Sequence, residues 1–206
     1  MSTAVRAASE TLRSVLQDAM ATDPVLSLLF TGAGASVVSL ANPDEMANAG
    51  ESGISLWLYR IIRDEQLLNA PPERIAPNLF RPTSLPVRLK YLIAPVIGAD
   101  GAGAPIATRH HILGAILRTF HERSLISGVL LAGDFAGTSV ELAVRLEDPE
   151  LEALARLWDS LDAGFQLSLS YEVGIVSINS ALPDAVGAPV TIALPEYGTA
   201  SRLVTA

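Results

Sequence analysis

The stretch VELAVRLEDPELEALARLWDSLDAGFQLSLSYEVGIVSI, residues 140–178, has the clearest structural pattern in the chain. Apolar and polar residues alternate over 140–146 and again over 165–175, and this period of two predicts two β-strands. Between them, Asp148 and Pro149 precede a run of helix formers rich in glutamate. Aspartate at the N-cap and proline at the first helical position favour a helix start there. The sequence therefore predicts a strand, a short helix and a second strand.

The short helix should bury one face and end at a glycine. Gly164 is expected to take the left-handed conformation that closes many helices. In the strand that follows, the alternation breaks at residues 174–176, which indicates a β-bulge or a stretch buried on both faces. The stripe expected to face the core consists of Leu151, Leu154, Trp158 and Leu161.

Patterns outside this block predict two more helices and several more strands. Apolar residues recur every three or four positions over 5–20 and 108–123, which is typical of long amphipathic helices. Residues 41–53 have a loop composition, and residues 63–84 form a connection without a pattern of its own, a type of segment that is often functional. The strand-like segments are residues 25–30, 36–40, 54–59, 85–93 and 190–194.

Strands and helices alternate irregularly, so the predicted fold is α+β: a single mixed β-sheet packed with two long helices and one shorter helix. Residues 1–178 are expected to form this domain. Residues 179–206 are rich in proline and glycine and are expected to form a C-terminal tail with one short strand.

Composition narrows the classes of function. Half of the 206 residues are apolar and 17% are charged, which excludes a disordered chain and favours buried subunit interfaces. The net charge of −8, without a basic stripe, argues against nucleic acid as a partner. The apolar runs are far shorter than the ~20 residues of a membrane span, so no membrane insertion is expected. The absence of cysteine excludes disulfides and thiolate sites, and the N-terminus lacks a signal peptide, which predicts a cytoplasmic protein.

No motif predicts a catalytic, cofactor or metal site. His110 and His111 diverge on their helix, and His121 lies about 16 Å from His110 along the same helix, too far to share an ion. The glycines at 32 and 34 do not precede a helix, and those at 98–103 lack the lysine of a phosphate-binding loop. The nucleophile motif Gly-x-Ser-x-Gly is absent. We therefore expect no enzyme activity, no cofactor and no bound metal.

Three segments resemble the cap, or tail-terminator, proteins of phage-tail-like contractile injection systems. They are SLPVRLKYLIAPV (84–96), HHILGAILRTFHERSLISG (110–128) and the block 140–178. Their shared features are Leu113-Gly114, the Leu157-Trp158 pair before a short turn, and the run from Leu167 to Val173. The first helix and the segment ISLWLYRI (54–61) also lie where that family has a helix and a strand.

This resemblance implies a structural role. Such proteins form a six-fold ring that ends the inner tube and holds the last sheath ring, so a hexameric homo-oligomer with inner tube and sheath proteins as partners is implied. The localisation implied is cytoplasmic, within an assembled phage-tail-like particle. The family has no catalytic residues to carry over.

One candidate contact comes from the residues themselves. Val190, Ile192 and Leu194 alternate with small or polar residues between Pro189 and Pro195. We expect this short strand to pair with a neighbouring ring subunit or with a sheath arm, unless it completes the sheet of its own domain. Two other functions remain open: a small-molecule enzyme or binding protein, and an oligomeric adaptor unrelated to injection systems.

Overall fold

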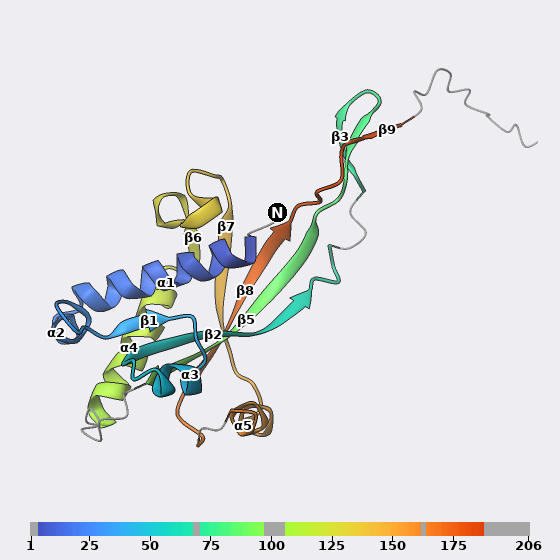
Figure 1. Ribbon diagram of the computed structural model, residues 1–206. Helices are drawn as coiled ribbons and strands as arrows, with labels where there is room; N and C mark the ends of the chain where they lie inside the picture. Colours follow the sequence, from blue (N-terminus) through green and yellow to red (C-terminus); the bar gives the residue numbers. More distant parts are fainter. Residues whose placement is uncertain (1–3, 68–70, 97–105, 162–163, 188–206) are drawn as a thin grey trace, which may run out of the picture.

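The computed structural model describes residues 4–67, 71–96, 106–161 and 164–187 (Figure 1). They form a six-stranded mixed sheet in the order β1-β2-β5-β8-β7-β6 and a separate three-stranded sheet in the order β3-β4-β9. The α+β prediction is confirmed, but two sheets replace the single one expected. The strands of the large sheet are β1 (Val37–Ser39), β2 (Gly53–Arg63), β5 (Leu85–Val96), β6 (Leu125–Ser127), β7 (Glu141–Glu147) and β8 (Leu169–Ile178).

The large sheet bends at two bulges. β1 runs parallel to β2, and all other neighbours in this sheet are antiparallel. The register of β5 against β8 shifts between Val87 and Leu89, which pair with Val176 and Val173, so β8 carries one extra residue there. The bulge predicted at residues 174–176 is confirmed. A second shift follows Leu58 on β2.

Two long helices and one face of the sheet enclose the main core. The helices are α1 (Ala4–Thr22) and α4 (Ile106–Glu122), close to the ranges predicted. Tyr91 of β5 is buried among them, and its hydroxyl lies 2.8 Å from the Ser9 hydroxyl of α1. Phe120 of α4 meets the ring of Tyr171 edge-on at 4.9 Å between centroids. Buried apolar side chains from α1, α4 and the sheet strands thus form one continuous cluster.

The opposite face of the sheet is covered in part by α5 (Leu151–Asp159). Trp158 is 1% exposed and packs against Leu92 and Ala94, so its predicted place in a core is confirmed. Leu154 and Leu161 pack at the edge of this cluster.

The predicted ends of this helix are wrong. The helix begins after Glu150, with no side-chain cap, because Glu147 still pairs with Ser170 of β8 and the chain needs residues 148–150 to leave the sheet. Asp148 and Pro149 therefore lie in the connection. Leu151 is 71% exposed, and Gly164 has no positive φ.

Three local predictions are also corrected. Residues 25–30 hold the short helix α2 (Ser27–Phe30), not a strand, because Asp23 Oδ1 accepts from the amides of Val25 and Leu26. Residues 41–53 hold α3 (Pro43–Asn48), begun by reciprocal hydrogen bonds between Asn42 and Glu45. Residues 63–84 hold the hairpin of β3 (Glu73–Ala76) and β4 (Leu79–Arg81).

Candidate interaction surfaces

The three histidines do not form a metal site. His110 and His121 are exposed on α4, while His111 Nε2 lies 3.2 Å from Asp23 Oδ1. Among the described residues, no group of three or more His, Cys, Asp or Glu side chains could hold a metal ion.

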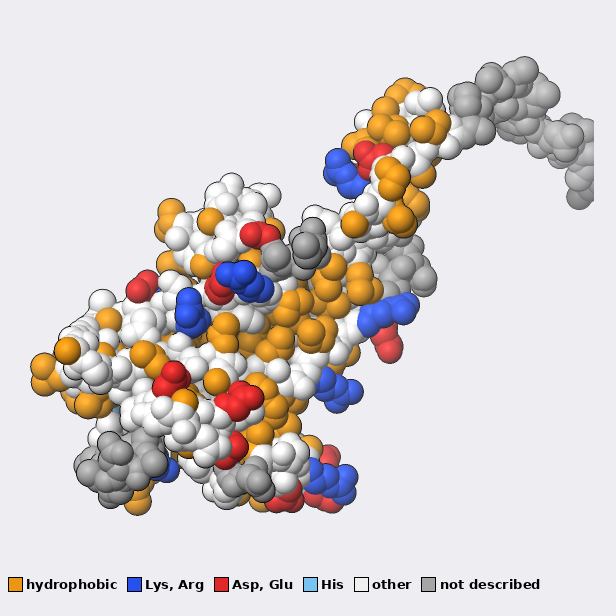
Figure 2. Space-filling view, viewed as in Figure 1, with side chains coloured by type: hydrophobic (Ala, Val, Ile, Leu, Met, Phe, Trp, Pro, Cys, Tyr) orange, Lys and Arg blue, Asp and Glu red, His pale blue; other side chains and the backbone are white. Residues whose placement is uncertain are grey.

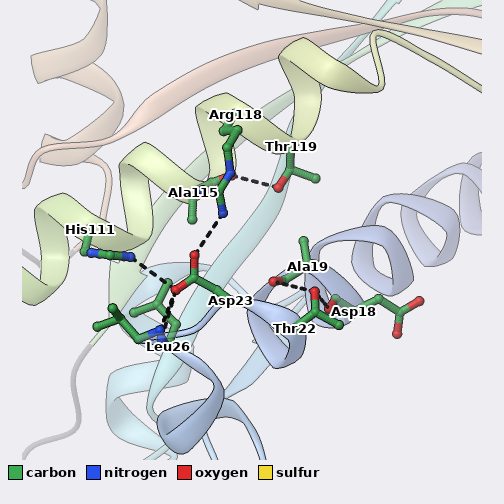
Figure 3. Close-up of polar contacts among 10 residues, drawn as sticks. Asp18, Ala19, Thr22, Asp23, Leu26, His111, Ala115, Arg118 and Thr119 are labelled. Carbon is green, nitrogen blue, oxygen red and sulfur yellow. Dashed lines mark hydrogen bonds and ion pairs between the residues drawn. The ribbon is translucent and has the colours of Figure 1, made fainter.

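Asp23 instead joins three elements (Figure 3). It follows α1, its Oδ1 accepts from the amides that start α2, and its Oδ2 accepts from Arg118 of α4 at 2.9 Å. The carboxylate side chain is 2% exposed. Burial opposes the charged form, but the hydrogen bonds from the Val25 and Leu26 amides, from Arg118 and from His111 prevail and lower the pKa of Asp23 to about 2. Asp23 is thus a structural contact.

A second polar cluster lies on the sheet face that α5 leaves open. Arg88 Nε donates to Asp64 Oδ2 at 2.7 Å, and Arg88 Nη1 lies 3.6 Å from Glu172 Oε1. Lys90 pairs with Glu147 and also lies 3.7 Å from Glu172. The Arg88 guanidinium lowers the pKa of Asp64. These charges thus pair with one another across β5, β7 and β8.

The most distinctive surface is an arm that extends from the body beyond the ends of β5 and β8 (Figure 1). We define the arm as residues 71–84 and 179–187. Its sheet consists of β3, β4 and the two-residue strand β9 (Ala185–Val186), which pairs with β4. Gly187 donates its amide to Asn78 at 2.9 Å. A Cβ on Gly187 would lie 2.6 Å from the Phe80 ring, so any other residue here would require the ring to move.

The arm has no core of its own. None of residues 71–81 or 182–187 is buried, and Leu182 and Val186 are 71% and 75% exposed. Besides its backbone pairing, its side-chain contacts include an exposed ion pair between Arg81 and Glu73. The Arg74 guanidinium also donates to the carbonyls of Ala76 and Pro77 and lies 6.0 Å from the centre of the Phe80 ring. Sheets of such short strands need a packed apolar face to be stable. The arm is therefore a candidate surface for a partner.

A second apolar surface lies at the other end of the molecule, where α1 turns into α2 (Figures 1 and 2). Val25, Leu28 and Leu29 are all exposed there, Leu28 by 86%. On the face shown in Figure 2, hydrophobic side chains also gather beside α1, toward the base of the arm. The arm, the α1–α2 end and the hydrophobic area beside α1 thus lie at different places on the surface. Such a distribution is typical of a protein that contacts several neighbours.

The sequence singled out residues 63–84 as a connection of a type that is often functional, but it did not predict their hairpin. One available signal was Pro77-Asn78 between two short apolar segments, which is a turn signature. The contact residues that the sequence did single out, Val190, Ile192 and Leu194, lie outside the described residues. No helix in the described ranges is long and apolar enough to cross a membrane.

Two solved structures are similar to this chain. The sheath/tube terminator of an extracellular contractile injection system (PVC), in the extended state, aligns over 97% of this chain with a TM-score of 0.61 and 20% identity. The tube-terminating cap of the anti-feeding prophage (AFP) aligns over 94% with a TM-score of 0.55 and 21% identity. This chain spans 65% and 60% of those two chains. At this identity the likeness shows a shared fold.

The family is shown by the sequence itself. A comparison with curated proteins gave no match. Residues 7–192, however, match the family described as the Pvc16 N-terminal domain. The matched range begins in α1 and continues past β9, so it contains both sheets and the arm. This chain belongs to the Pvc16 N-terminal domain family.

Proposed function

We propose that this protein is a structural cap of a contractile injection particle: a tail terminator that ends the inner tube and holds the last ring of the sheath. The observation that carries the proposal is the fold, shared over 97% of the chain with a sheath/tube terminator. The unpartnered arm and the exposed apolar end give such a protein two surfaces for neighbours.

The proposed partners are inner tube proteins, sheath proteins and further copies of this chain. A terminator must match a ring of identical tube subunits, and closed cyclic symmetry is the usual solution for a homo-oligomer. We propose six copies of the 21.7 kDa chain, about 130 kDa in all. The cap acts inside the assembled particle and needs no cofactor, metal or nucleic acid.

Termination follows from surface complementarity. A ring whose one side matches the end of the tube, and whose other side does not, removes the surface on which the next tube ring would form. An enzyme or small-molecule binding protein would need polar groups converging in a pocket. On the open sheet face, the side chains of Arg88 and Lys90 are instead paired with Asp64, Glu147 and Glu172, which favours the structural role.

The tail supplies a proposed contact within this assembly. Val190, Ile192 and Leu194 alternate with Thr191 and Ala193 between two prolines, a pattern that predicts a five-residue strand with one apolar side. We place this strand on a neighbouring ring subunit or a sheath arm, where it adds to an existing sheet by main-chain hydrogen bonds.

The test is to assemble particles from the tube and sheath proteins of the same system, with and without this chain, and to measure tube length by negative-stain electron microscopy. With the chain, lengths should cluster and one end should carry a terminal ring. Without it, tubes should vary in length and lack that ring. Equal length distributions in the two samples would refute the proposal.

A further inference from the structure

The outer part of β8 has one edge that the described sheet does not use. β8 pairs with β5 as far as Ile178, but its last pair with β7 joins Gly174 to Ala143. Beyond that pair β7 continues for two residues, Leu142 and Glu141, but these pair with β6 and not with β8. In a β-strand, the backbone amide and carbonyl groups of alternate residues point toward the same neighbouring strand. Some of these groups in residues 175–178 therefore point toward the side that no strand pairs with.

A groove of about 580 Å³ lies along this edge. Ile175 and Ser177 of β8 line one side of it. Phe135 of the short helix η2 (Gly133–Phe135) and Val140, which precedes β7, line it as well. Two carboxylates, Asp134 and Glu141, also border the groove. An extended segment could thus lie beside β8 with apolar and polar neighbours.

This edge lacks the features that protect free strands from pairing. Charged side chains and bulges commonly block an exposed edge. The outer edge of β2 has both, because Arg60 and Arg63 are exposed and the register shifts after Leu58. Residues 175–178 are Ile-Val-Ser-Ile, with no charge and no proline, and regular pairing with β5 resumes at Val176, past the bulge at Gly174 and Ile175. The β8 edge is therefore suited to accept another strand.

The tail segment 190–194 matches this edge in length and chemistry. The segment has five residues between two prolines, and the open edge of β8 has four residues. No residue from Ala188 to Pro195 is charged, so nothing in the segment repels the two carboxylates of the groove. Val176 is buried and faces the core. If the apolar residues of the segment face the core as well, Thr191 and Ala193 face the opposite side, as Ser177 does.

The segment reaches this edge most easily on another copy. Gly187 is held on the arm by Asn78, and Figure 1 shows that the arm leads away from the large sheet. Only about 10 Å of extended chain separates Gly187 from Val190. A return to the β8 of the same chain would require a reversal at Ala188 and Pro189.

We propose that the segment Val190–Leu194 of one copy adds as a strand to residues 175–178 of the next copy in the ring. The proposal rests on the ring of the proposed function and names both sides of one contact in it. Each copy gives one strand and receives one, so the contact is head-to-tail and can close into a ring.

Cysteine cross-linking tests the pairing, because the chain has no cysteine of its own. Full-length S177C/T191C and S177C/A193C variants would be assembled with tube and sheath proteins and oxidised. A disulfide needs Cα atoms about 4.4–6.8 Å apart with side chains on the same face. We expect at least one of these variants to give covalent oligomers in steps of 21.7 kDa that a reductant dissolves.

Matched control variants test which strand edge receives the segment and which face of the segment points away from the core. S177C/I192C should link poorly, since residue 192 points to the opposite face. I61C/T191C and L125C/T191C place the cysteine at exposed positions of β2 and β6 and should not link. Links within one chain only, links from Ile61→Cys or Leu125→Cys, or no links in S177C/T191C and S177C/A193C would each overturn the proposal.

The same samples separate this inference from the proposed function. Particles of uniform length with a terminal ring but without the Ser177→Cys link leave the cap role intact and refute the strand exchange. Covalent rings that do not alter tube length leave the exchange intact and refute the cap role.

Discussion

Replacing Asp23 with asparagine tests the junction of α1, α2 and α4. Asparagine keeps an oxygen that can accept from the amides of Val25 and Leu26, but it removes the charge that faces Arg118 and His111. The folded pKa of about 2 lies below the ordinary value of 3.8, and this difference corresponds to about 2 kcal/mol of stability at neutral pH. We expect Asp23→Asn to lose about that much, or roughly 4–8 °C in Tm.

The stability contributed by Asp23 should decrease as the pH falls. Because the folded pKa of Asp23 is depressed, its contribution is fully present above about pH 4 and is lost as the pH falls toward 2. Urea unfolding followed by tryptophan fluorescence should show a difference between wild type and Asp23→Asn that shrinks over this range. Asp18→Asn, at an exposed position of α1, is the matched control and should be neutral. A difference below ~0.5 kcal/mol at pH 7, or one constant down to pH 2, would refute the reasoning.

Three further substitutions test the packing. Trp158→Ala should cost about 3–5 kcal/mol by emptying the cluster under α5, while exposed Leu151→Ala should cost under 1; similar melting temperatures for the two variants would contradict this. Gly114→Ala should stabilise the protein by about 0.5–1 kcal/mol, because the site on α4 is open, and a lower Tm would show a hidden contact. Gly53→Ala should prevent folding, because its Cβ would lie 2.0 Å from the Val37 carbonyl oxygen; a soluble variant with an unchanged circular dichroism spectrum would contradict that expectation.

The sequence predicted those elements whose burial is periodic. α1, α4, β5 and β7 each bury a regular set of apolar side chains, so their patterns were visible without the structure. The bulge near Gly174 was also visible, because an extra residue shifts the alternation.

What the sequence did not reveal depends on contacts between distant residues or on strands too short for a pattern. The start of α5 is set by the pairing of Glu147 with Ser170, which no local signal shows. The hairpin of the arm has strands of four and three residues without a buried face, so apolar and polar residues do not alternate in its sequence.

The sequence predicted that the protein has interaction surfaces, but it did not predict where they lie. Low charge and the absent motifs indicated interfaces in place of chemistry, and the structure adds an arm and an open edge of β8 that composition cannot locate. Val190, Ile192 and Leu194 remain predictions, since they lie outside the described residues.

The most direct test of the cap role is an electron cryo-microscopy reconstruction of the end of an assembled particle. The account predicts a single ring of six copies of this chain, seated on the last tube ring and in contact with the last sheath ring. A terminal ring with another number of subunits would contradict the proposed hexamer. A particle end completed without this chain would contradict the cap role itself.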